Sequence, residues 1–331
     1  MTAARDDEYL TPCQWHLNSI NLADTNHAIF HIPFPYNSEF EYIVDRALIR
    51  SDCIVILVSE LHPSTVDFIT RYQRSNIKYF TCGSIEGIES NRWMNWFILG
   101  TDFYKRNNIL DQLTPYTTKE KIFDILLGSS RPHRDFINNA VRLYGLSDVS
   151  ILTYYKYTHR ELFINDDFIV EPGTIAIAPI THTIGKVDYY GEEVHISTIV
   201  PISIYNQTAY SIVAETNFDN HYSFYTEKIV KPILAKRLFI VFSGQHYLRN
   251  LRSLGFKTFD SIIDETYDTI EDSTIRFEQT IKQMQYLVTI PQEEILAKIK
   301  PIVEHNYQLM LSTDWLGQFH AKLKTVLTET K

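Results

Sequence analysis

The sequence predicts an α/β protein with two domains, each built on a parallel β-sheet. Its 331 residues exceed the usual size of one domain. Short apolar runs alternate with amphipathic helical segments, which is typical of parallel sheets with crossover helices. This alternation starts again after a turn at Pro115–Thr118. We therefore predict two Rossmann-like domains, residues 1–115 and residues 116–331.

The first predicted domain contains three strand-like runs that are separated by two helical segments. The runs AIFHIP, CIVILVSE and IKYFTCG are short and apolar, and EFEYIVDRALI and STVDFITRYQR lie between them. The strand, helix, strand order predicts a parallel sheet. The longest apolar runs, Cys53–Val58 and Leu238–Phe242, are too short for the ~20 residues of a membrane helix. We interpret them as buried strands.

The second predicted domain repeats the pattern. Its expected strands are KIFDILLGSS, ILTYY, AYSIVAETN and RLFIVFSG, and its expected helices are RDFINNAVRLYGL, FYTEKIVKPILAK and HYLRNLRSLG. The stretch 170–200 is rich in β-branched residues and turns, which indicates an insertion. From Ile270 the pattern is helical and ends in an amphipathic segment, Gln292–Thr328.

The composition is that of a folded cytoplasmic protein. Apolar residues make up 44% and charged residues 21%. The opening MTAARDDEYL lacks the basic start and apolar core of a signal peptide, and we expect no membrane partner. The cysteines Cys13, Cys53 and Cys82 form no close pair, as expected in a reducing compartment. We interpret Cys53 as a core residue.

Common catalytic and binding motifs are absent. The sequence has no G-x-G-x-x-G, P-loop, G-x-S-x-G or H-E-x-x-H motif. Its histidines lack ligand spacing, and Asn165-Asp166-Asp167 is interpreted as a solvated acidic turn, so no metal site is predicted. The formal net charge of −9 argues against a surface that binds nucleic acid throughout, but it leaves room for a local basic groove.

The segment Ala209–Gly244 contains the strongest candidate for a ligand site. Thr226 is a plausible N-cap, and a helix starting at Glu227 would direct its free N–H groups and positive dipole end toward an anion. Lys228 adds a cation that suits a diphosphate, on which negative charge grows as a sugar leaves. Glu227 is expected to accept hydrogen bonds from ribose hydroxyls. A structural alternative is that Glu227 only complements the helix dipole while Lys228 is solvated.

This segment resembles the donor-binding motif of the α-1,3-fucosyltransferase family. In that family a strand ending in F-E-N-[ST] is followed by Y-x-T-E-K, a helix and a second strand. Here Glu215 stands at the first acidic position, and Thr226, Glu227 and Lys228 match T-E-K. The resemblance implies a GT-B architecture of two facing Rossmann-like domains. Residues 1–115 are then expected to bind the acceptor, and residues 116–331 a nucleotide-diphosphate sugar as donor, with C-terminal helices that can cross back to the first domain. It implies no metal and no cofactor.

The chain departs from the family pattern near this motif. Phe224 replaces the family's tyrosine, so the adjacent Tyr225 is the candidate for that donor contact. F-E-N-[ST] becomes A-E-T-N, with extra residues before T-E-K. These departures leave the base and the sugar of the donor open.

A second similar region is Asp124–Leu143, which matches the family's V-S-N-x-x-x-x-R-x-x-F-x-x-x-L. Arg134 fits the arginine that reaches the diphosphate, and Arg131 is a close alternative. Guanidinium groups bind phosphate in a bidentate manner. A cation at a helix start is otherwise opposed by the helix dipole, which favours the phosphate interpretation.

A third, weaker similarity concerns the acceptor. The segment V-S-E-L-H-P (Val58–Pro63), at the end of the apolar strand CIVILV, resembles the family's N-x-E-S-P. Trp93–Arg106 resembles F-N-W-x-x-x-Y-R-R-D-S-D. Glu60 would then follow a parallel strand, where α/β sheets place their sites, and act as general base on the acceptor hydroxyl. His62 is the alternative base. The structural alternative is a plain loop carboxylate.

The segment HYLRNLRSLGFKTFDSIIDETYD is also similar to short glycosyltransferase-like proteins of tailed phages. The resemblances together imply an inverting glycosyltransferase, located in the host cytoplasm if phage-encoded. The acceptor is either hydroxymethylcytosine in duplex DNA, with an arabinosyl or glucosyl transfer, or a glycan. Basic residues of the first domain are candidates for a DNA-binding face: Arg71, Arg74, Lys78, Arg92, Lys105 and Arg106. The alternative class is a non-catalytic protein that binds a nucleotide sugar or nucleic acid.

Overall fold

The computed structural model describes residues 27–32, 38–49, 51–129, 131–155, 182–183, 186–218 and 220–329. The chain divides into two compact units. Unit 1 comprises Met1–Leu99 together with Asp314–Lys331, and unit 2 comprises Gly100–Thr313. The acidic turn at 165–167, Cys13 and residues 170–181 and 184–185 of the predicted insertion lie outside the described residues.

Unit 1 is built on a parallel sheet in the order β1-β2-β3-β5. Its strands are β1 (His27–His31), β2 (Cys53–Val58), β3 (Ile77–Thr81) and the short β5 (Asn91–Arg92). β2 lies between β1 and β3, and all six of its residues are buried. A strand buried on both faces needs apolar side chains throughout, which is why CIVILV shows no alternation.

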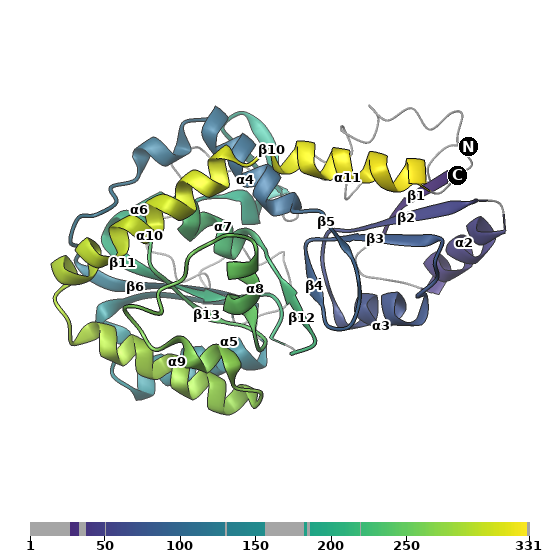
Figure 1. The fold of residues 1–331 in the computed structure, drawn as a ribbon. Coiled ribbons are helices and arrows are strands. Elements are labelled where there is room, and N and C mark those ends of the chain that lie inside the picture. The colour runs from purple at the N-terminus through teal and green to yellow at the C-terminus, as the bar shows by residue number, and fades with distance from the viewer. Residues whose placement is uncertain are drawn as a thin grey trace. The chain divides into compact units, whose positions relative to one another are not determined.

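Helices cover both faces of this sheet (Figure 1). α2 (Ser38–Leu48) and α3 (Pro63–Arg71) lie on one side, where Phe40 and Phe68 meet edge to face at 5.5 Å. α11 (Trp315–Glu329) lies on the other side. Its Phe319 contacts the rings of Phe80 and Trp93 at 5.5 and 5.9 Å. A helix distant in sequence thus completes the core of the N-terminal sheet.

Unit 2 contains the larger parallel sheet, in the order β13-β11-β6-β7. Its strands are β6 (Lys121–Ser129), β7 (Ser150–Tyr155), β11 (Thr208–Ala214) and β13 (Phe239–Phe242). β11 lies between β6 and β13 and is buried throughout. A small antiparallel sheet is formed by β8 (His182–Thr183), β9 (Lys186–Tyr189) and β10 (Glu192–His195), and it lies within the predicted insertion.

The helices of unit 2 flank its parallel sheet. They are α5 (Pro132–Leu143), α6 (Ile202–Gln207), α7 (Glu227–Leu234), α8 (Tyr247–Ser253), α9 (Ser273–Val288) and α10 (Gln292–Ser312). α7 and α10 pack together on one face, and α5 and α9 lie on the other (Figure 1). α4 (Asn95–Arg106) begins in unit 1 and ends in unit 2.

These elements confirm the predicted α/β class and the two Rossmann-like parallel sheets. The strand and helix pattern repeats as expected because each parallel strand needs a crossover to reach its neighbour. None of the helices in the described part of the chain combines the length and apolar character needed to cross a bilayer.

Candidate functional site

The residues predicted to bind a donor gather at the carboxyl edge of the unit 2 sheet. β6 ends at Ser129 and leads into α5, while β11 ends at Ala214 and leads toward α7. Parallel strands present their carboxyl ends at one edge, so both connections meet there. The site is therefore built from two segments about 85 residues apart in the sequence.

Glu215 lies at the centre of this edge, directly after β11, and it is fully buried. Its carboxylate accepts hydrogen bonds from the hydroxyls of Thr226 and Tyr247, both at 2.8 Å. Backbone N–H groups of Thr216 and Thr226 also donate to it, at 3.2 and 3.4 Å. Burial raises the pKa of Glu215, and the charge of Lys228 opposes that shift. Because its oxygens are already occupied, Glu215 organises the site.

Thr226 is the N-cap of α7, as predicted. Its backbone is extended, and its hydroxyl accepts a hydrogen bond from the N–H of Lys228 at 3.2 Å. A threonine side chain at this position satisfies one of the free N–H groups of the first helical turn. The same hydroxyl donates to Glu215. The start of α7 is thereby fixed to the end of β11.

Lys228 and Glu227 form an ion pair at the start of α7. The Nζ of Lys228 lies 2.8 Å from Oε1 of Glu227 and 3.2 Å from the hydroxyl of Thr216. Glu227 is buried, and burial raises its pKa, but the charges of Lys228 and Lys231 more than offset this, so the pKa lies below the usual value. Glu227 is ionised at neutral pH. Lys228 keeps about a quarter of its side chain exposed, so a ligand has access to it.

Arg131 and Arg134 belong to the start of α5 and lie in the same cluster. Arg131 is the N-cap residue, and its guanidinium donates to the carbonyl of Thr216 at 2.5 Å. His133, between them, is fully buried with its Nε2 2.8 Å from the carbonyl oxygen of Glu215. These two contacts tie the start of α5 to the loop after β11.

Arg134 is almost completely buried within this cluster of charges. Burial and the neighbouring Arg131 lower its pKa to about 10, while Glu227 and Glu215 act in the opposite direction. Gly128 leaves room for it, since a Cβ at that position would lie 3.2 Å from Nη1 of Arg134. Concentrating cations at the starts of two helices is unfavourable because of the helix dipole, unless an anion binds there.

The third helix that follows a strand of this sheet differs from α5 and α7. At the start of α8 the carboxylate of Asp268 accepts hydrogen bonds from the N–H groups of Leu248 and Arg249, at 2.8 and 2.9 Å. A carboxylate of the chain itself therefore occupies the anion position of α8. The candidate anion site is confined to α5 and α7.

Tyr225, which was predicted to contact the donor, is buried, and its ring lies against that of Tyr247 at 5.1 Å. Sequence reasoning did not identify Tyr247, His133 or Lys231. The only signals were local ones: Lys231 follows Lys228 by three residues, and His133 stands next to Arg134 in R-P-H-R. Tyr247 lies 32 residues after the carboxylate that it contacts, so spacing gives no signal.

Glu60 and His62, the predicted catalytic residues, belong to unit 1. Glu60 follows β2 and is partly buried. His62 is exposed and serves as N-cap of α3, with its Nδ1 accepting from the N–H of Ser64. At the ends of β1 and β2, Nε2 of His31 lies 3.0 Å from the hydroxyl of Ser59, and burial lowers the pKa of His31 to about 4.

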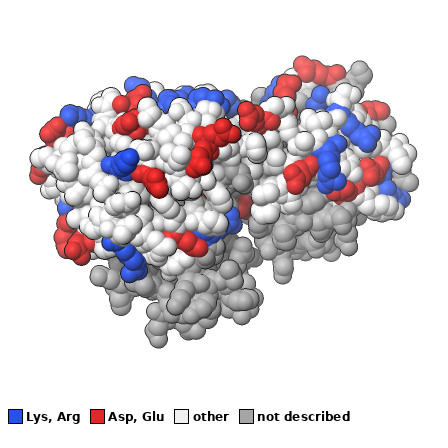
Figure 2. Space-filling model, turned by 90° about the horizontal axis from the view of Figure 1, so that it is seen from below, with Lys and Arg blue, Asp and Glu red and all other residues white. Residues whose placement is uncertain are grey.

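The basic side chains predicted to face DNA are partly engaged by carboxylates. Arg71 pairs with Glu41, and Arg106 pairs with Glu192 and with Asp102. Figure 2 shows acidic and basic side chains interspersed over the described surface on the face in view. On that face no broad area of one sign stands out.

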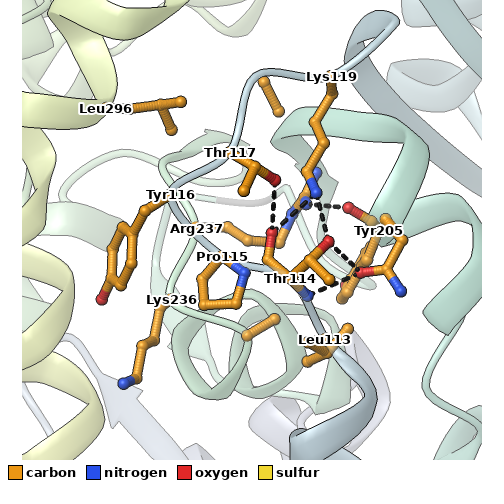
Figure 3. Close-up of a pocket in the computed structure, with 13 residues that line it drawn as sticks. Leu113, Thr114, Pro115, Tyr116, Thr117, Lys119, Tyr205, Lys236, Arg237 and Leu296 are labelled. Atoms are coloured by element: carbon orange, nitrogen blue, oxygen red, sulfur yellow. Dashed lines mark hydrogen bonds between the residues drawn. The ribbon is translucent and has the colours of Figure 1, made fainter.

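A small pocket opens at the opposite, amino edge of the unit 2 sheet (Figure 3). Its cations are bound within the protein. Arg237 donates to Asp124, Ser211 and two backbone carbonyls, and Lys119 donates to Thr114. The buried Asp124–Arg237 pair, 2.7 Å long, therefore anchors the sheet. We interpret this pocket as structural.

Comparisons with known proteins identify no family for the chain. No protein-family model matches it, and no curated protein matches it. Among solved structures, it is similar to the catalytic domain of starch synthase IV from Arabidopsis thaliana bound to ADP and acarbose, with 11% identity and a TM-score of 0.37. The match covers 87% of this chain and 57% of that one. At this level neither fold nor function is transferred from the starch synthase.

Proposed function

We propose that the chain is a nucleotide-sugar-dependent glycosyltransferase that moves a sugar to an acceptor hydroxyl with inversion. The observation that carries the proposal is the cluster at the starts of α5 and α7, where Arg131, Arg134 and Lys228 surround the loop after β11. Such a cluster suits a diphosphate, whose oxygens accept charge-assisted hydrogen bonds. The α-1,3-fucosyltransferase-like motifs support the same assignment.

In the proposed reaction the acceptor oxygen forms a bond to the anomeric carbon as the bond from that carbon to the diphosphate oxygen breaks. Negative charge grows on the leaving nucleotide diphosphate, and the three cations stabilise it. The acceptor proton passes to a base, for which Glu60 is the proposed residue and His62 the alternative. Glu227 is proposed to hold the ribose hydroxyls.

Replacing Lys228 by alanine tests the donor site. We expect the K228A variant to lose transfer by roughly two orders of magnitude or more, because a cation facing the developing charge is removed. Lys298→Ala is the control, since Lys298 is exposed and forms a surface pair with Glu294. Undiminished transfer in K228A, with its fold intact by circular dichroism, would overturn the proposed role.

The acceptor is proposed to be hydroxymethylcytosine in DNA, with a glycan hydroxyl as the alternative. A panel of nucleotide sugars is incubated with hydroxymethylcytosine duplexes and with simple sugars, and products are read by mass. Transfer to DNA should weaken as salt rises, because phosphate contacts release counterions. Transfer to simple sugars without transfer to the duplexes would exclude DNA as the acceptor. Nucleotide binding with neither hydrolysis nor transfer would favour a non-catalytic protein.

A further inference from the structure

A second lysine lies on the face of α7 that carries Glu227 and Lys228. Lys231 follows Glu227 by four residues and Lys228 by three, and residues at these spacings are neighbours on a helix surface. Helical side chains lean toward the N-terminus, so the stem of Lys231 is directed back toward the start of α7. Its charge interacts with both Glu227 and Lys228. Lys231 therefore belongs to the donor cluster.

The amine of Lys231 makes no hydrogen bond or ion pair with the described part of the chain. The side chain is partly buried, and within the described part of the chain no acceptor lies at hydrogen-bond distance from its amine. Oε1 of Glu227, the nearby carboxylate, already accepts a hydrogen bond from Lys228. Burial lowers the pKa of Lys231 to about 8, with Lys228 acting in the same direction and Glu227 opposing it.

Three further groups near Glu227 keep their charge state in the range where Lys231 titrates. Tyr104 of α4 and Tyr205 of α6 face Glu227, and burial raises the pKa of both far above neutrality. Arg134 of α5, with a pKa of about 10, stays protonated at pH 8. Glu215 is the remaining titratable neighbour, and burial raises its pKa, so the Lys231 variants below are needed to separate its proton from that of Lys231.

We propose that Lys231 is a further cation of the donor site, and that it takes up a proton when the diphosphate of a nucleotide binds. This inference rests on the proposed function, because it requires an anion at the start of α7. A bound diphosphate adds negative charge beside the amine and stabilises its ammonium form. As pH rises, Lys231 therefore loses its proton at a lower pH in the free protein than in the complex. Affinity for nucleotide diphosphates therefore falls as pH rises above about 8, while the phosphates themselves remain fully ionised.

Calorimetric titration of the full chain with ADP, UDP and GDP tests the inference. Near pH 8 to 9, wild type should take up a proton on binding, seen as a dependence of the heat on the ionisation enthalpy of the buffer. The K231M variant should show no uptake and bind about tenfold more weakly near pH 7. K231R, whose charge is permanent, should bind without uptake and keep its affinity at high pH.

Lys236→Met is the matched control, because Lys236 is also partly buried but pairs with Glu304 at 3.0 Å and lies 4.2 Å from the ring centre of Tyr307. The K236M variant should bind the probes and take up a proton as wild type does. Persistent uptake in both K231M and K231R, with wild type binding the probe, would overturn the role of Lys231 and leave the proposed function standing. If wild type binds none of the probes at any pH, the proposed function fails first.

Discussion

His133 shows how a single side chain links the two halves of the donor site. Its Nε2 donates to the carbonyl of Glu215, a hydrogen bond that by itself would raise the pKa of the ring. Burial, followed by the charge of Arg134, lowers the pKa of His133 from 6.5 to about 3. This buried position therefore favours an uncharged imidazole as hydrogen-bond donor. The sequence alone shows only a histidine between two arginines.

This histidine makes the fold sensitive to acid. Below pH 6.5 the unfolded chain protonates the ring while the folded chain does not, so the unfolding free energy falls as pH drops toward 3. At pH 5 protonation of His133 in the unfolded chain lowers the unfolding free energy by at most about 2 kcal/mol. His31 acts in the same direction between pH 6.5 and about 4, whereas Glu215, whose pKa is raised, acts in the opposite one.

We expect His133→Gln to reduce the loss of stability between pH 7 and pH 5, because the amide nitrogen can replace Nε2 without titrating. Urea denaturation at both pH values measures this difference. His305→Gln is the control, since that ring is only partly buried on α10 and its Nε2 lies 2.9 Å from the carbonyl oxygen of Gly255. An H133Q variant that loses as much stability as wild type would contradict the assignment.

At the scale of elements, α7 is held from two sides. Its start is fixed by Thr226 and Glu215, and its side chains pack closely against α4 at Gly100. A Cβ on Gly100 would lie 2.5 Å from Cγ1 of Val230, which is buried on α7. The glycine permits this approach even though glycine within a helix is unfavourable by about 1 kcal/mol relative to alanine.

Gly100→Ala should therefore destabilise the protein, by about 1–3 kcal/mol, despite the better helix propensity of alanine. Val230→Ala leaves a void that the new methyl group can enter. The double variant should then be more stable than the sum of the two single changes predicts, which a double-mutant cycle by urea denaturation measures. Additive effects would show that the helices adjust their separation.

Sequence patterns were sufficient for these elements but not for all the contacts between them. The runs CIVILV and TAYSIVA are recognisable as buried parallel strands, and the Thr226 cap follows from T-E-K before an apolar helical face. The contacts of Glu215 with Tyr247 and His133 arise only when separate crossovers meet at one sheet edge. Periodicity describes one element at a time, so it cannot predict them.

At the scale of the molecule, the two units offer separate spectroscopic and binding signals. All four tryptophans of the sequence fall within the ranges of unit 1, whereas the donor cluster belongs to unit 2. Tryptophan fluorescence thus follows unit 1, and nucleotide binding follows unit 2.

Phe319→Ala should destabilise unit 1 by about 3–5 kcal/mol, because the ring is buried against Phe80 and Trp93. The tryptophan transition should shift to lower urea while nucleotide affinity under native conditions is retained. Phe136→Ala is the comparison, since that ring contacts Phe277 in unit 2. An unchanged tryptophan midpoint in F319A would contradict the packing of α11.

The return of α11 to unit 1 also sets an order of events during synthesis. A ribosome must make all of Gly100–Thr313 before Asp314–Lys331 emerge. Domains generally fold as units as the chain emerges, N-terminal ones first. Here the N-terminal sheet must wait, with Phe80 and Trp93 uncovered, while unit 2 has its whole sequence available. The nascent chain should therefore acquire nucleotide binding before its first sheet is closed, and chaperones should meet it at that open aromatic face.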